Sequence, residues 1–589
     1  MVQTILTVIP GKDYTVHAGD SLWAIAVRAY GSGAEWPKIY QANMQTIGKN
    51  PNLIFPGQVL HIPLVSVPTP TPIPVPTPTS GQPDLPLRTS TEIQGDILAG
   101  FNKDYRLYLF LRFPDQYHGR AWLKELIPSI ADTKDVAAFN TLFSLARHGA
   151  GGKDPVNLKA TWVNVDFTLD GLKLLLNADP SASLKAQGFS SFVAGPEASA
   201  ATINGDTGPS DPTHWVVGRK DQPIHALLNI QSDDPDDLAV EAQKLKMLVA
   251  QYGLTIVYEQ RGATLPGDLR GHEQFGYKDG ISQPGVKGFD PADLNATHVD
   301  PTATLGYVQG HPGTEIIQAG EFILGQPVEA GPGQKPFAPP SDLRWMLNGS
   351  FQVFRRLSQD VPGFEEQAQQ NLNPLLPNDS LRDRIGALLV GRWKSGTPVD
   401  LSPDTDNGLT GDAEINNFNF MQRDVDTIHV SDDADGLRCP HFGHIRKVYP
   451  RQHNFPFNTN RLKRIIRRGV PFGNHYEPER GEGFDAKAER GLVFVAYMAS
   501  IENQFEFLMQ VWVNSPAFPV PEIEQGVEAV TGPDPIIGDA AIHPSPITLK
   551  HAGGLDLQAD FLRKVQTTGT LYAFAPAISV LKELANGTL

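Results

Sequence analysis

The sequence contains almost no cysteine. Cys439 is the only one in 589 residues, so the chain cannot form an intrachain disulfide. Zinc and iron–sulfur sites built from several thiolates are excluded for the same reason, and so is covalent haem attachment through a CxxCH motif. Thiol chemistry therefore does not organise this chain.

Long apolar runs and an excess of basic residues are missing as well. No apolar stretch approaches the roughly 20 residues of a membrane span, and the first residues, MVQTILTVIPGKDY, lack the basic start of a secretory signal. The chain has 49 Lys and Arg against 65 Asp and Glu, a formal net charge of -16. This charge argues against nucleic-acid binding and repels anionic lipid. We expect a cytoplasmic protein, with export by an unusual route left open.

Proline, by contrast, is abundant and concentrated in one stretch. Residues 66–86 read SVPTPTPIPVPTPTSGQPDLP. Alternating Pro and Thr favours extended polyproline II structure, because proline fixes φ and removes amide donors. The pattern predicts a small module at residues 1–65, a semi-rigid linker at residues 66–89 and a body at residues 90–589 that is long enough to bury a large core.

The small module is predicted to fold as a βααβ unit. A strand at residues 14–16 precedes a helix that carries Leu22, Ile25 and Ala26 on one side, and residues 58–62 return as a strand. The stretches YTVHAGDSLWAIA, IYQAN and NPNLIFPGQVLHIP resemble the LysM module, in its order. That resemblance implies binding to N-acetylglucosamine-containing glycans such as peptidoglycan. A protein-interaction or targeting role is the alternative.

Strand-like runs and amphipathic helices alternate along the body. β-Rich composition marks residues 107–113 and also ATWVNVDFTL, IHALLNIQS, LTIVYEQRG and LVFVAYMAS. Helical periodicity appears in DDLAVEAQKLKMLVAQYG, which ends at Gly253, and in ENQFEFLMQVWVN. The pattern indicates an α+β fold of antiparallel sheets with helices on one face.

One turn-like stretch places an acid between two glycines. FGYKDGISQP, residues 275–284, puts Asp279 between Gly276 and Gly280. Asp followed by Gly is a common turn signal, because Asp tolerates the left-handed conformation and Gly adopts it freely. Local evidence alone therefore favours a turn over a role for Asp279 in proton transfer.

Cations and potential metal ligands gather in a second region. RCPHFGHIRKVYPR and NTNRLKRIIRRGVPFG, residues 438–451 and 458–473, carry histidines, the cysteine and many arginines in an otherwise acidic chain. Charge runs usually form a solvated surface. Beside potential metal ligands, however, this run suits a bound anion, and the two propionates of haem would qualify.

Ordered blocks of the body resemble the dye-decolorizing (DyP-type) peroxidases. They are IQGDILAGF, GYKDG (matching GxxDG), NGSFQVFRRLSQDVPGFE, CPHFGHIRKVYPR, RIIRRGVPFG and FVAYMASIENQFEFLMQVWVN. The HIRK and IENQF forms look most like the long subgroup, which has fungal and some bacterial members. The resemblance implies two ferredoxin-like α+β halves that hold a b-type haem between them without a covalent bond.

The same resemblance implies roles for individual residues. His444 would be the proximal iron ligand, and Asp279 and Arg467 would lie on the distal face. Arg468 would replace Arg467 if the alignment shifts by one position. Arg356 and Arg446 are expected to pair with the haem propionates.

Three further expectations concern the proximal region. Glu502 or Glu506 is expected to accept a hydrogen bond from the second ring nitrogen of the iron ligand. His441 is expected to pack or to hydrogen-bond in a channel rather than to bind iron. Cys439 is expected to be a buried structural residue, although a thiolate is the axial ligand in some haem enzymes.

These roles imply peroxidase chemistry. Hydrogen peroxide must lose a proton from one oxygen and gain one on the other before that oxygen leaves as water, and a carboxylate at Asp279 can do both. A guanidinium at Arg467 would stabilise the charge on the leaving oxygen. The family's donors are dyes, phenolics and similar aromatic reductants. Bulky donors would be oxidised at a surface aromatic residue, for which four candidates are available whose alternative role is core packing: Trp345, Trp393, Trp512 and Tyr497.

Two other functions stay open at this point. A haem carrier or sensor with little turnover would keep His444 but would need neither Asp279 nor Arg467. A cell-wall scaffold would depend on the LysM module instead. The sequence also leaves the oligomeric state open, including a homo-oligomer.

Overall fold

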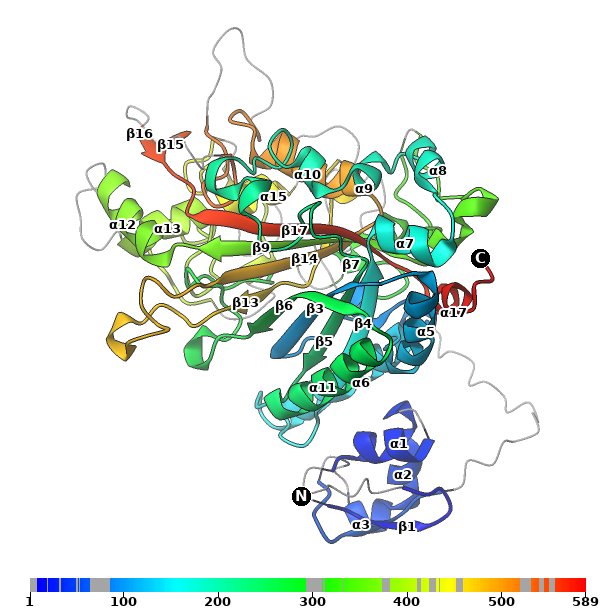
Figure 1. The fold of residues 1–589 in the computed structure, drawn as a ribbon. Coiled ribbons are helices and arrows are strands. Elements are labelled where there is room, and N and C mark those ends of the chain that lie inside the picture. Colours follow the sequence, from blue (N-terminus) through cyan, green and yellow to red (C-terminus); the bar gives the residue numbers. More distant parts are fainter. Residues whose placement is uncertain are drawn as a thin grey trace.

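The computed structural model describes most of the chain (Figure 1). Outside the described part lie residues 1–7, 18–19, 31–32, 49–50, 52, 64–84, 293–309, 311–312, 332, 373–381, 410–414, 423–430, 434, 452–458, 520–530, 540–544 and 550–556. Most of the predicted linker falls in the stretch 64–84. Its last residues, however, form the 3₁₀ helix η2 (Pro86–Thr89), where the Leu87 amide donates to the Gly288 carbonyl at 2.9 Å. These linker residues therefore belong to the body.

The small module has the predicted strands and helices. Strands β1 (Asp13–Thr15) and β2 (Val59–His61) pair antiparallel, and between them come α1 (Leu22–Tyr30), α2 (Trp36–Ala42) and the short α3 (Met44–Ile47). The hydroxyl of Ser21 accepts from the Ala24 amide and so caps α1. Leu22, Ile25 and Ile39 fill the core between helices and sheet. The βααβ prediction is confirmed, with the 3₁₀ turn η1 (Gly33–Glu35) and α3 as additional helical turns.

The body is built on one large, mainly antiparallel sheet whose strands run in the order β12-β14-β9-β17-β4-β5-β3-β6, with β13 also paired to β14. Its first half uses β3 (Tyr105–Arg112), β4 (Thr161–Phe167), β5 (Ala226–Ser232) and β6 (Thr255–Ala263). Its second half uses β9 (Ser350–Gln359), β12 (Ile466–Arg467), β13 (Val470–Phe472), β14 (Gly491–Met498) and β17 (Val565–Ala575).

Both halves repeat one strand order. The strands of each half can be numbered one to four in chain order, with β12 and β13 counted as one strand. Both halves then have the order 2-3-1-4 across the sheet. This is the order of a ferredoxin-like βαββαβ unit. The two halves meet where β17 joins β4, at the pair Phe574 and Phe167. The predicted α+β class with two ferredoxin-like halves is confirmed.

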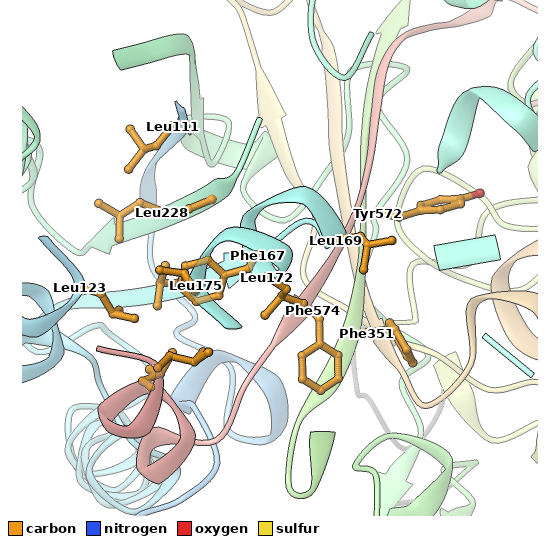
Figure 2. Packing of buried hydrophobic residues seen from close by; sticks show 14 of the residues in the cluster. Leu111, Leu123, Phe167, Leu169, Leu172, Leu175, Leu228, Phe351, Tyr572 and Phe574 are labelled. Atoms are coloured by element: carbon orange, nitrogen blue, oxygen red, sulfur yellow. The ribbon is translucent and has the colours of Figure 1, made fainter. Parts of the chain in front are cut away.

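Side-chain alternation along the strands builds a core on each face of this sheet. In β4, Val163, Val165 and Phe167 pack on one face, whereas Asn164 and Asp166 point to the other. The first face is covered by α5 (Gln116–Leu126), α7 (Leu169–Leu176), α11 (Pro235–Gln251) and α17 (Ile578–Asn586). Figure 2 shows this packing, including the rings of Phe351 and Phe574, whose centroids lie 5.2 Å apart.

The predicted helix at ENQFEFLMQVWVN takes an unusual form. It is wound as two π-helical segments, η12 (Ile501–Glu506) and η13 (Leu508–Val513), and Ser500 caps it by accepting from the Asn503 amide. π-Helical turns are rare and are frequent at functional sites. The segment directs Phe505, Leu508 and Met509 into the cavity described below.

No helix in the described part of the chain is both long and apolar enough to cross a bilayer.

Candidate active site

A deep cavity lies beside the second half of the sheet. Its volume is about 240 Å³. Most of its wall is apolar, with β9, β14 and the π-helical segment contributing Leu357, Leu492, Phe494, Phe505 and Met509. Polar groups form the smaller part of the wall, and they include the side chains singled out in the two sequence regions above: Asp279, His444 and Arg467.

Asp279 sits at the end of a tightly closed loop. Its amide donates to the Gly271 carbonyl at 2.9 Å, and its Oδ1 accepts from the Gly280 amide at 2.6 Å. Gly276 and Gly280 have φ of 88° and 76°, a region that side chains with a Cβ rarely adopt. The turn reading is therefore correct for this stretch, and the turn also aims the carboxylate into the cavity.

A second acid holds this loop together, and sequence reasoning missed it. Glu273 accepts from the amides of Phe275 and Tyr277, both at 2.9 Å, and from the side-chain amide of Gln359 at 2.5 Å. Burial raises the pKa of Glu273 to about 7. No local pattern marks this role, because the carboxylate acts by closing the loop onto β9.

Arg467 is the arginine that meets Asp279. Its Nη1 donates to Asp279 Oδ1 at 2.8 Å, and its Nη2 donates to the Ser282 carbonyl at 3.0 Å. Arg468 points the other way and donates to three carbonyls of α4 (Gly95–Leu98), those of Asp96, Ile97 and Leu98. Adjacent residues of an extended segment face opposite sides, so only Arg467 reaches the cavity.

The electrostatics keep Asp279 ionised. Burial pushes the Asp279 pKa upward, but the charge and hydrogen bond of Arg467, the Gly280 amide and the charge of His444 together hold it below its ordinary value. The Asp279 side chain is 34% exposed and that of Arg467 is 29% exposed, because both face the open space of the cavity. The pair thus presents a carboxylate with an adjacent cation.

His444 enters the cavity from the start of α15 (His444–Val448). Its Nδ1 lies 2.7 Å from Asp534 Oδ2, and the other oxygen of Asp534 accepts from the amides of Ile536 and Ile537. Asp534 is fully buried. A carboxylate at this position requires a proton on Nδ1, which leaves Nε2 as the free lone pair. In the described part of the chain, nothing hydrogen-bonds to Nε2.

The prediction that Glu502 or Glu506 hydrogen-bonds to His444 was wrong. Glu502 accepts from the Ser191 amide at 2.5 Å. Glu506 binds the hydroxyls of Ser191 and Tyr572. Both glutamates lie in the π-helical segment and turn away from His444. The actual partner, Asp534, comes after a stretch whose sequence carries no metal-site signal.

The two arginines expected at the haem propionates also lie elsewhere. Arg356 alternates with the cavity residues Leu357 and Gln359 along β9, so it faces the other side of the sheet, where it binds Glu489 at 2.6 Å. Arg446 is a fully buried residue of α15 that donates to Asp433 at 2.9 Å and to the Cys439 carbonyl at 2.6 Å. Neither lines the cavity.

Cationic residues other than Arg356 and Arg446 line the cavity. Lys463, Arg464 and Arg451 line the cavity. The guanidinium of Arg464 stacks on the Tyr449 ring at 3.6 Å, and no hydrogen bond from its side chain is formed within the described part of the chain. The cation-rich run thus does bring positive charge to the cavity, and alternation along the chain decides which of its members face it.

The remaining candidate residues lie outside the cavity wall. Cys439 is fully buried, and burial raises the pKa of its thiol. His441 is 5% exposed and does not line the cavity. The four candidate surface aromatics, Trp345, Trp393, Trp512 and Tyr497, are all buried. Their exposure matches core packing and not a surface oxidation site.

The residues of this cavity fit a haem. The imidazole of His444 offers an unpaired Nε2 that is backed by a buried carboxylate, an arrangement typical of metal-ligating histidines. Apolar walls suit the porphyrin, and Lys463 and Arg464 suit its propionates. His444, Asp279 and Arg467 line the same cavity, and the charge of Arg467 acts on the pKa of both Asp279 and His444.

Comparisons with known proteins agree with this geometry. Residues 92–266 match the model of the DyP dimeric α+β barrel domain, residues 423–533 that of the C-terminal domain of Dyp-type peroxidases, and residues 14–63 that of the LysM domain. Peroxidase 2 of Mycetinis scorodonius is 31% identical over 85% of this chain and 91% of its own length.

Solved structures of dye-decolorizing peroxidases are also similar to this chain. An ancestral D-type dye-decolorizing peroxidase is 30% identical, with a TM-score of 0.65 over 86% of this chain and 100% of its own. The decolorizing peroxidase of Auricularia auricula-judae is 27% identical, with a TM-score of 0.65 over 84% of this chain and 99% of its own. The chain therefore belongs to the family of DyP-type (dye-decolorizing) peroxidases.

Proposed function

We propose that this peroxidase holds haem b without a covalent bond, reduces hydrogen peroxide through Asp279 and Arg467, and oxidises dyes, phenolics or similar aromatic donors. One observation carries the proposal. A single cavity contains an imidazole backed by the buried carboxylate of Asp534 and, within electrostatic reach of it, a carboxylate paired with a guanidinium. A haem carrier would not need the second pair.

Each of these side chains has a distinct task. The ionised Asp279 accepts a proton from one oxygen of hydrogen peroxide and returns it to the other, which leaves as water. Arg467 stabilises the negative charge that develops on the leaving oxygen, and its fixed charge cannot be lost by deprotonation. Its hydrogen bond to Asp279 also sets the carboxylate's orientation.

The proximal side binds and orients the cofactor. His444 would ligate the iron through Nε2, while Asp534 fixes the ring and increases its basicity. When bound, haem would supply the redox chemistry for one-electron oxidation of the donor. Cys439 lies outside the cavity and the chain has no second cysteine for a thioether link, which favours non-covalent binding.

An absorption spectrum with a turnover assay tests the proposal. The purified chain is expected to show a ferric Soret band that shifts when hydrogen peroxide is added, and to bleach an anthraquinone dye only when peroxide is present. Free haemin at the same concentration is the control for non-specific oxidation. A stable Soret band with no dye bleaching above that control would instead identify a haem carrier.

The LysM module is proposed to bind N-acetylglucosamine-containing glycans. The match of residues 14–63 to the LysM domain supports this role. The full chain is expected to sediment with insoluble peptidoglycan, and N-acetylglucosamine oligomers should release it. Cellulose, whose sugars lack the acetamido group, is the matched control polymer. Equal sedimentation of a chain without residues 1–65 would reject a glycan role for the module.

A further inference from the structure

The small module and the body share one aromatic cluster. Trp23 of α1 is only 4% exposed, and its ring centroid lies 5.5 Å from that of Phe139 and 6.2 Å from that of Trp162, both in the body. The three rings meet edge to face, with Phe139 and Trp162 5.7 Å apart. Edge-to-face pairs at such distances are favourable beyond the apolar area that they bury.

Trp23 is not part of the module's own core. The neighbouring positions Leu22, Ile25 and Ala26 turn inward and pack with the two strands, whereas Trp23 points to the body. Gly33 lies directly against the indole, since a Cβ at this glycine would come within 2.1 Å of Trp23. The indole of Trp23 therefore projects from the module with Gly33 beside its ring, and residues of the body cover it.

The body offers a matching apolar stripe on α6 (Thr133–Gly149). Phe139, Leu142, Phe143 and Ala146 follow the spacing i, i+3, i+4, i+7 and all belong to the shared cluster. The inner side of α6 is different: Val136 and Ala137 pack into the clusters of the body. α6 thus carries a second apolar stripe, which Leu158 and Trp162 of the body extend and which Trp23 of the module covers.

The covered helix also supports a segment behind the active site. The Asn140 side chain of α6 donates to the carbonyls of Ala99 and Gly100, at 3.1 and 2.9 Å. Just before them, carbonyls of α4 accept from Arg468, the neighbour of Arg467. Contacts that restrain α6 therefore also restrain the backbone of α4, which accepts the hydrogen bonds of Arg468.

We propose that the stripe on α6, together with Trp162, is an intramolecular docking surface whose partner is the LysM module, with Trp23 as the anchor. The module is then a fixed part of the enzyme. A Pro/Thr spacer of some twenty extended residues would otherwise let it move roughly 60 Å away. Docking fixes the orientation in which the module presents its uncovered side to a ligand.

Small-angle scattering of the full chain tests this proposal with three variants. Trp23→Ala removes the anchor, and Phe143→Glu places a charge on the α6 stripe without changing the module. Met44→Ala is the matched control, because Met44 is an apolar residue of the module that is 52% exposed. A compact chain of 589 residues has a radius of gyration of about 25 Å.

The wild type and Met44→Ala are expected to scatter near this value. Trp23→Ala and Phe143→Glu should give a larger radius, and amide exchange in α6 and at residues 95–100 should become faster. An extended wild type would overturn the proposal, and so would unchanged scattering in both variants. Expansion in Trp23→Ala alone would also overturn it, because the effect would then come from the module's own folding.

Discussion

Asp279→Asn is expected to lower kcat/KM for hydrogen peroxide by about 10²–10⁴-fold while the Soret band keeps its position. Asparagine preserves the size of the side chain and can still accept from Arg467 and from the Gly280 amide, but it cannot take up a proton. Stopped-flow measurement of the reaction with peroxide separates this step from donor oxidation. Asp268→Asn, a change in an exposed acid outside the cavity, is the control. A rate equal to the wild type would remove Asp279 from the mechanism.

The pH dependence follows from the direction of the Asp279 pKa shift. Arg467 and the Gly280 amide hold this pKa below its ordinary value in spite of burial. The carboxylate therefore stays ionised, and able to act as a base, as the pH falls to about 4, where an ordinary Asp is half protonated. The rate with peroxide should be lost only below that pH. The same shift stabilises the fold above the unfolded Asp pKa, and this contribution disappears as the pH falls through the lower folded value.

His444→Ala is expected to abolish tight haem binding, so that the purified variant lacks the Soret band of the wild type. The cavity would keep its apolar walls but lose the one unpaired imidazole nitrogen that they contain in the described part of the chain. Haem titration followed by absorbance gives the affinity. Added imidazole should restore part of the band, because a free ligand can occupy the space left by the side chain.

Two further variants show whether Asp534 supports haem binding by orienting His444. Asp534→Asn is expected to weaken haem affinity by about 10–100-fold, because the ring loses the carboxylate that orients it. His441→Ala, at a buried histidine outside the cavity wall, is the matched control and should bind haem normally. Loss of the Soret band in His441→Ala, with retention in His444→Ala, would reverse the assignment.

Short-range patterns in the sequence predicted much of this molecule. Residue alternation and helical spacing identified the strands around Leu107 and Val163, the helix that ends before Gly253 and the βααβ module. Motifs identified Asp279, His444 and Arg467, and the structure brings all three to one cavity. These features were visible because each depends on residues that are close together in the chain.

The failures share one cause, which is that a side chain's direction and distant partner do not appear in its local pattern. Arg356 and Arg446 stand in the right motifs, but the alternation of β9 and the rotation of α15 turn them away from the cavity. Asp534 reaches His444 across 90 positions of the chain. Glu273 is recognised only once the loop that it closes is seen.

By itself, then, the amino-acid order determined the fold class, the two-part organisation and the residue types that meet at the cavity, because periodicity and turn chemistry act within a few residues. Only the tertiary structure decided which arginines face the cavity, which carboxylate supports His444 and where Trp23 is buried. Those choices depend on contacts between elements far apart in the chain, and such contacts form only when the whole sheet and its helices have packed.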